Sequence, residues 1–146
     1  MKKIARAALA LLAGLTLALP AGTEENMERE KLVITVNGTA LYAVPEENEA
    51  ARALTEKLED APVTITMNGY GGWEQVGGLG FALPAEDEYL TAQAGDIMLY
   101  CGNQMVIFYG SNSWEYTRLG HIEEKTADEL EAILGSGEIT VTLSLG

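Results

Sequence analysis

The sequence predicts a mainly β fold, a closed β-barrel of about eight strands with two short helices. Three observations predict it. Several runs beyond residue 30 alternate apolar and polar residues, the two-residue period of a strand with one buried face. Turn residues separate these runs, and the first and last runs share one pattern, so they are candidates to pair. A sheet of so many antiparallel strands must hide its edges, and closure into a barrel does so.

Residues 1–21 carry the pattern of a cleaved export signal. Three basic residues precede an apolar run at 7–19, and small residues follow around Ala21. The run is shorter than the roughly 20 residues of a membrane-spanning helix, so a permanent anchor is the weaker alternative. Residues 22–30 are polar and indicate a flexible tether, which leaves 31–146 as one domain. We therefore expect an exported protein, secreted or in the cell envelope, without a stable membrane anchor.

The chain is strongly acidic, with a formal net charge of −13. Removal of the signal leaves six basic residues against 22 acidic ones, a net charge of −16. Such a charge repels the phosphates of nucleic acids and anionic lipids, so nucleic acid is not an expected partner. Basic peptides and cations remain open as partners, and a merely solvated acidic surface is the alternative.

A metal or cofactor site is not predicted. One histidine and one cysteine are too few for zinc, and neither a calcium loop nor a phosphate loop occurs. A single cysteine also excludes an internal disulfide. Because Cys101 follows the apolar residues 97–100, we expect a small buried side chain rather than a nucleophile.

The first predicted elements are a hairpin and a helix. Strands at 32–36 and 39–44 flank Asn37-Gly38, a dipeptide typical of two-residue hairpin turns because both positions need positive φ. A helix is expected at 46–59, where apolar residues recur every three or four positions. Alternation then resumes at 63–67 and predicts a third strand.

Between residues 68 and 84 the periodicity fails. Six of the sixteen glycines fall here, beside Tyr70, Trp73 and Phe81, so we expect an irregular loop. Aromatic side chains in such a loop either fill the core or line a pocket, and both alternatives stay open.

The second half of the chain predicts further strands and one helix. A strand begins at Tyr89, and the runs 97–101 and 104–109 are apolar on both faces around Gly102-Asn103, which indicates a two-residue turn between central strands. Another strand is expected at 114–119 and the last at 139–145. Between these two, Thr126 and Glu129 form a capping-box pattern for a helix that ends before Gly135.

Segments of this half and of the glycine-rich region resemble the bacterial cyclophilin-like domain family. They are Asn-Gly-Tyr-Gly-Gly-Trp-Glu at 68–74, residues 95–104, and Phe-Tyr-Gly-Ser-Asn-Ser-Trp at 108–114 with Tyr-Thr-Arg-Leu-Gly at 116–120. The resemblance covers residues 32–122. It implies a closed barrel of about eight strands, a minimal relative of peptidyl-prolyl isomerases whose members mostly lack an established activity.

The sequence departs from true cyclophilins at their catalytic motif. No Phe-His-Arg occurs, and the lone histidine is His121, so isomerase activity is not implied residue by residue. Arg118 is the candidate catalytic donor, because a guanidinium in an aromatic cleft could bind a carbonyl or a carboxylate. An ion pair with one of the many carboxylates is the structural alternative. The candidate ligand-binding residues are Tyr70, Trp73, Phe81, Tyr100, Gln104, Phe108, Trp114 and Arg118.

Three hypotheses about function follow. The first is a non-catalytic module that binds a peptide or a small ligand between the glycine-rich loop and Arg118. The alternative is a weak peptidyl-prolyl cis-trans isomerase that uses Arg118. A purely structural role is the third.

Overall fold

The computed structural model describes residues 30–146, and Lys31–Gly146 form one compact unit. The predicted export signal at 1–21 and nearly all of the predicted tether lie outside the described residues. Within residues 30–146, no helix is both long enough and apolar enough to cross a membrane.

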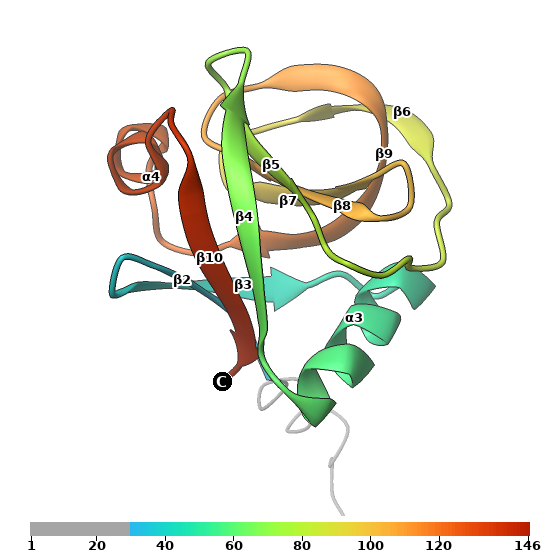
Figure 1. The fold of residues 1–146 in the computed structure, drawn as a ribbon. Coiled ribbons are helices and arrows are strands. Elements are labelled where there is room, and N and C mark those ends of the chain that lie inside the picture. Colours follow the sequence, from blue (N-terminus) through green and yellow to red (C-terminus); the bar gives the residue numbers. More distant parts are fainter. Residues whose placement is uncertain (1–29) are drawn as a thin grey trace, which may run out of the picture. The chain divides into compact units, whose positions relative to one another are not determined.

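Antiparallel strands form a single sheet whose hydrogen bonds close into a ring (Figure 1). Around the ring the order is β3-β2-β10-β4-β5-β8-β7-β9, and β9 pairs again with β3. The remaining strand, β6, lies outside the ring and pairs with β9. The predicted mainly β fold is thus confirmed, with nine strands in the described part. Their bounds are β2 Leu32–Val36, β3 Thr39–Pro45, β4 Val63–Tyr70, β5 Glu74–Gly78, β6 Glu88–Ala92, β7 Asp96–Tyr100, β8 Gln104–Phe108, β9 Asn112–Ile122 and β10 Ile139–Leu145.

The first and last strands of this unit pair with each other, as predicted from their matching patterns. β10 runs antiparallel to β2 from Val141 opposite Val36 to Leu145 opposite Leu32. Just beyond the pair, the backbones of Lys31 and Gly146 exchange two hydrogen bonds of 3.0 and 3.1 Å. The ends of the folded unit therefore lie side by side.

The predicted hairpin at the start of the fold is confirmed. Val36 lies opposite Thr39, so the turn holds two residues. Asn37 and Gly38 have φ of 50° and 81°, the positive values that this class of tight turn requires.

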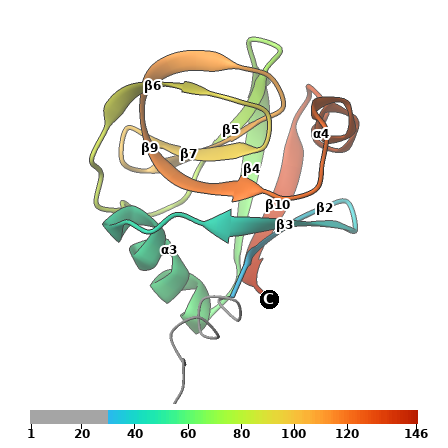
Figure 2. The same cartoon turned by 180° about the vertical axis from the view of Figure 1, so that it is seen from behind.

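Two helices complete the fold, and the capping residues explain their bounds. The helix α3 spans Glu49–Asp60, three residues later than predicted, because the Asn48 side chain accepts a hydrogen bond from the Ala51 amide and so caps the helix. The helix α4 spans Ala127–Leu134 and begins with the predicted capping box of Thr126 and Glu129. The two helices lie apart from each other in both views of the fold (Figures 1 and 2).

The strands separate two apolar clusters. The larger one fills the ring and includes residues from α3 and α4. The smaller one lies on the outer face of β7 and β8, where Tyr116 of β9 and Ala92 of β6 cover it. In Figure 2, β9 follows a wide arc with β6 beside its first half. Alternate residues of β7 and β8 belong to different clusters. The larger cluster contains Ile97, Leu99, Met105 and Ile107, and the smaller one contains Met98, Val106 and Phe108.

The predicted irregular loop at 68–84 is wrong in its first part. Residues 68–70 continue β4, and Glu74–Gly78 forms β5, which joins β4 to β8 in the ring. Two of the glycines, Gly69 and Gly77, lie where another part of the backbone approaches closely. A Cβ at Gly77 would lie 2.3 Å from the Thr66 carbonyl oxygen on β4, so only glycine fits there.

The predictions for Cys101 and its turn are also wrong. Tyr100 pairs with Gln104, so the loop between β7 and β8 holds three residues rather than two. Cys101 lies in this loop with a φ of 54°, and its side chain is exposed. The apolar run 97–100 coincides with the paired residues of β7, and Cys101 is the first residue of the loop that follows.

Candidate ligand-binding site

A cavity of about 440 Å³ opens on the outer face of the sheet, beside the smaller apolar cluster. The strands β4, β5, β7, β8 and β9 and the β4–β5 turn all supply side chains to it. Aromatic residues predominate, and one carboxylate is among them. The lining residues are Tyr70, Trp73, Glu74, Val76, Tyr100, Gln104, Asn112, Trp114 and Tyr116.

The β4–β5 turn positions one wall of the cavity. Tyr70 pairs with Glu74 and encloses Gly71, Gly72 and Trp73. The Trp73 carbonyl accepts hydrogen bonds of 3.0 and 2.9 Å from the amides of Tyr109 and Gly110, which fixes the turn to the end of β8. The indole folds back over Gly71, where a Cβ would lie 2.3 Å from the ring. The Tyr70 ring meets the indole at 87° with centroids 6.0 Å apart, so the two rings form a corner.

The opposite wall comes from β7 and β9. The Asn112 side chain donates a 3.0 Å hydrogen bond to the Tyr116 hydroxyl, which holds that ring in place. The Tyr116 ring lies 6.3 Å from the Tyr100 ring and packs edge-on against Phe108 at 5.5 Å. Trp114, two residues before Tyr116 on the same strand, remains 54% exposed at the cavity mouth.

Glu74 is the charged group of this cavity. Its residue is only 6% exposed. The Trp73 indole N–H donates a 3.2 Å hydrogen bond to its Oε1, and no ion pair to Glu74 occurs among residues 30–146. Burial raises the pKa of Glu74 to about 7, although the hydrogen bond from Trp73 acts in the opposite direction. A carboxyl group with such a pKa changes its charge close to neutral pH.

The structure brings together five of the eight residues predicted to bind a ligand. They are Tyr70, Trp73, Tyr100, Gln104 and Trp114. Phe108 lies fully buried beneath the cavity, where it supports Tyr116. Phe81 lines a different hollow with Gly80 and Asn103, and the Lys57 ammonium lies 4.9 Å from the centre of its ring.

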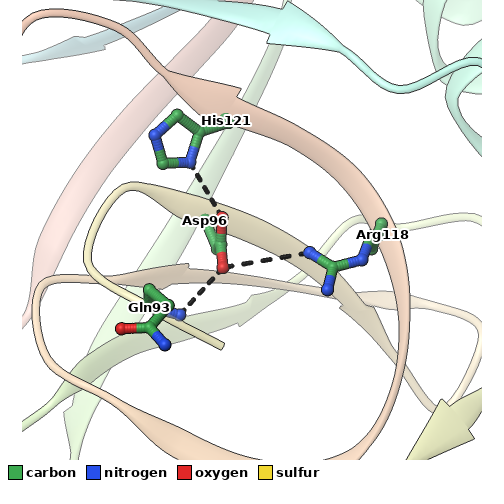
Figure 3. A network of polar contacts seen from close by, with 4 residues as sticks. All are labelled: Gln93, Asp96, Arg118 and His121. Carbon is green, nitrogen blue, oxygen red and sulfur yellow. Dashed lines mark hydrogen bonds and ion pairs between the residues drawn. The ribbon is translucent and has the colours of Figure 1, made fainter. Parts of the chain in front are cut away.

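Arg118 lies away from the aromatic cavity. It lines a separate hollow together with five glutamates and no aromatic residue: Glu46, Glu47, Glu49, Glu86 and Glu88. Its guanidinium lies 4.0 Å from Asp96, in agreement with the structural alternative of an ion pair (Figure 3). The predicted groove that joins the glycine-rich segment to Arg118 is therefore not formed.

Asp96 is the centre of the polar network around Arg118 (Figure 3). One of its oxygens accepts a 2.8 Å hydrogen bond from the Gln93 amide, and the other lies 2.8 Å from Nδ1 of His121. A carboxylate only accepts, so Nδ1 carries the proton in this contact. The network ties the turn before β7 to β9 at the irregularity between Ile97 and Met98. Its geometry is that of a structural brace.

Four lining residues escaped the sequence analysis: Glu74, Val76, Asn112 and Tyr116. Asn112 and Tyr116 lie two residues on either side of Trp114, and this i, i+2 spacing on one strand could have identified them. Glu74 and Val76 have the same spacing, but the glycines around β5 concealed the strand.

Comparison with known proteins agrees with this architecture. A model of the Cyclophilin-like family matches residues 34–144. Among solved structures, the solution structure of the hypothetical protein AF2241 from Archaeoglobus fulgidus is similar, with a TM-score of 0.56 and 17% identity over 80% of this chain and 97% of that one. At this identity the likeness concerns the fold alone. No curated protein matches the sequence.

Proposed function

The chain belongs to the cyclophilin-like family, and we propose that it is a non-catalytic binding module. The aromatic cavity takes up a small ligand or a side chain of a peptide. A single observation carries this proposal: aromatic side chains from separate strands converge on one open cavity instead of closing over it.

The dimensions and lining of the cavity support this function. Its volume of about 440 Å³ falls within the range of roughly 300–1,000 Å³ typical of small-molecule sites. Such sites combine an apolar lining with a few polar groups that orient the ligand, and here Glu74, Gln104 and Asn112 are those groups. The exposed rings of Tyr70 and Trp114 offer a surface that the fold itself does not cover.

Tryptophan fluorescence tests the proposal directly, because both tryptophans of the chain, Trp73 and Trp114, line the cavity. Three probes of matched shape are titrated: choline, the neutral alcohol in which carbon replaces the choline nitrogen, and tert-butylacetate. We expect a saturable change in emission with at least one probe. No saturable change with any of the three would refute a binding cavity.

Two tyrosine variants show whether the probe binds in the cavity. Tyr70 and Tyr42 are similarly exposed, at 63% and 51%, but only Tyr70 lines the cavity. We expect Tyr70→Ala to weaken binding about tenfold, the order of one lost aromatic contact. Tyr42→Ala, on β3, should bind as the wild type does. Equal effects of the two substitutions would place the site elsewhere.

Prolyl isomerisation through Arg118 receives no support from its surroundings, since glutamates rather than aromatic rings line that hollow. We expect the protein not to accelerate the isomerisation of a proline peptide, and probe binding to be unchanged in Arg118→Ala. Acceleration that Arg118→Ala abolishes and Arg52→Ala retains would instead establish the isomerase.

We also propose that the protein is exported, on the strength of the basic and apolar pattern in residues 1–21. Fractionation of expressing cells and N-terminal sequencing test this proposal. A mature chain that begins near Gly22 outside the cytoplasm is the expected result. A cytoplasmic chain that retains residues 1–21 would contradict it.

A further inference from the structure

The buried carboxylate of Glu74 faces the cavity, and no residue within 30–146 forms an ion pair with it. We propose that the cavity binds an organic cation, an ammonium group with apolar substituents, over its aromatic rings and with Glu74 as the counter-ion. This inference rests on the proposed binding function and adds the chemical class of the ligand.

The unpaired state of Glu74 is the first argument. A buried charge is normally paired, because transfer of a lone charge out of water is costly. No lysine, arginine or histidine of residues 30–146 lines the cavity. Three basic side chains of the described residues contact groups outside the cavity: Lys31 pairs with Glu123, Arg118 pairs with Asp96, and Lys57 lies over the Phe81 ring. A ligand that enters the cavity is therefore the available counter-ion.

The aromatic rings are the second argument. The face of an aromatic ring carries negative potential and attracts cations, and tryptophan does so most strongly. Five aromatic side chains line the cavity, and two of them are tryptophans: Tyr70, Trp73, Tyr100, Trp114 and Tyr116. The perpendicular rings of Tyr70 and Trp73 form a corner that fits a rounded group. An ammonium with methyl or methylene substituents meets both the rings and Val76, and it loses less hydration than a bare ion.

A metal ion fits the same cavity poorly. Glu74 is its only carboxylate, and no group of three or more potential metal-ligating side chains occurs in residues 30–146. Metal ions of the calcium or magnesium class require six or more oxygen ligands. The cavity offers aromatic carbon in their place.

The charge state of Glu74 couples this binding to pH. The other titratable groups that surround it are the phenols of Tyr70 on β4, Tyr100 on β7, Tyr109 after β8 and Tyr116 on β9. Burial raises the pKa of Tyr109 and of Tyr116. The pKa of Tyr100 is also raised, mainly by its hydrogen bond with the Cys101 side chain. Glu74, with a pKa of about 7, is thus the group that ionises near neutral pH. A cation favours its ionised form, so affinity rises with pH and binding releases a proton.

The first experiment compares choline with its neutral carbon analogue on the full chain, with tryptophan emission as the signal. Choline keeps its charge at all pH values, so any pH dependence belongs to the protein. At pH 8 we expect choline to bind about tenfold more tightly than the analogue. Between pH 6 and pH 8 the choline affinity should rise by up to roughly tenfold, as a carboxyl with a pKa near 7 ionises, while that of the analogue stays constant.

Substitution of the carboxylate provides the second experiment. Glu74→Gln keeps the shape of the side chain and removes its charge, so the preference for choline over the analogue should shrink toward one and its pH dependence should vanish. Glu56→Gln, on α3, is the matched control and should preserve both. If Glu74→Gln does not fold, the pH dependence of the wild type still decides the matter.

The outcomes separate this inference from the proposed function. Equal or tighter binding of the neutral analogue, or of tert-butylacetate, overturns the cationic ligand and leaves the binding cavity intact. Absence of any probe signal overturns both. A short peptide with trimethyllysine serves as a further arm: tighter binding than choline assigns the cation to a protein side chain, and weaker binding assigns it to a free small molecule.

Discussion

Glu74 couples the stability of the fold to pH through its burial. Its pKa rises from 4.5 to about 7 in the folded state, so the native protein retains a proton that the unfolded chain has already lost. Between these two pH values the native state binds more protons than the unfolded state. The free energy of unfolding therefore falls as pH rises through this window.

Glu74→Gln should remove this loss of stability. A pKa difference of this size corresponds to roughly 3 kcal/mol. We expect the variant to gain up to this amount relative to the wild type as pH rises from 4 to 8, measured by urea unfolding at each pH. A stability difference that is constant with pH would contradict the buried, unpaired state of Glu74.

Glu129 offers a control of opposite sign. Its hydrogen bonds with Thr126 in the capping box lower its pKa, and it is exposed. Its contribution to stability is therefore present above its unfolded pKa and lost as pH falls. Glu129→Gln should cost more stability at pH 7 than at pH 3.

At the scale of single residues, sequence reasoning found the aromatic side chains but not the carboxylate. Tyr70, Trp73 and Trp114 are large and rare, so they could be selected by type alone. Glu74 is one of 22 acidic residues, and it lies in β5 between β4 and β8, a pairing that the local sequence does not show. Cys101 shows the converse, because its apolar neighbours suggested burial while its own backbone turns outward.

At the scale of elements, the glycines of the β4–β5 turn position the indole of Trp73. Gly71 and Gly72 both have positive φ, at 66° and 82°. They differ in their surroundings, since a Cβ at Gly71 would overlap the Trp73 ring while nothing lies within 4 Å of a Cβ at Gly72. Substitutions at Gly71 and Gly72 therefore distinguish the effect of backbone strain from the effect of displacing the Trp73 ring.

Gly71→Ala should therefore abolish ligand binding, whereas Gly72→Ala should only reduce stability. Both substitutions place alanine at positive φ, at a cost of about 1–2 kcal/mol each. Gly71→Ala must also move the indole out of the cavity wall, which should shift its emission spectrum. Equal emission spectra and equal affinities in the two variants would show that the ring does not depend on Gly71.

Two elements encoded by local signals were predicted correctly, whereas the strand β5 was not predicted. The Asn37-Gly38 turn and the capping box of α4 are encoded within a few residues, so the sequence sufficed. The strand β5 holds only five residues, two of them glycines, and it exists because β4 and β8 pair on both sides of it. The pairing of a strand with distant neighbours cannot be deduced from the alternation of apolar and polar residues within that strand.

At the scale of the whole molecule, the paired ends make a circular permutation feasible. Lys31 and Gly146 are already joined by two backbone hydrogen bonds. A permutant of residues 31–146 with these ends linked by two or three glycines, and with new termini before Lys125, should fold and bind the same probes. Deletion of residues 139–146 should instead unfold the protein, because β10 pairs with both β2 and β4. Circular dichroism with thermal melting distinguishes the two, and a folded deletion variant would contradict the role of β10.

The sequence anticipated the closure of the ring but not the second apolar cluster. Matching one-sided patterns in the terminal strands predicted their pairing. The runs at 97–101 and 104–109 indicated burial on both faces, yet nothing local showed that β6 and β9 would cover the outer one. The predicted groove consequently extended from the glycine-rich segment to Arg118, which lies in a separate hollow.

The strands β7 and β8 have one face toward the interior of the ring and the other toward the smaller apolar cluster and the cavity. Each lining side chain on these strands is one position away from a side chain that sustains the ring, as Tyr100 is from Leu99 and Gln104 from Met105. Under the proposed binding function, substitutions of the lining side chains on these two strands should change ligand preference while the side chains that fill the ring stay the same.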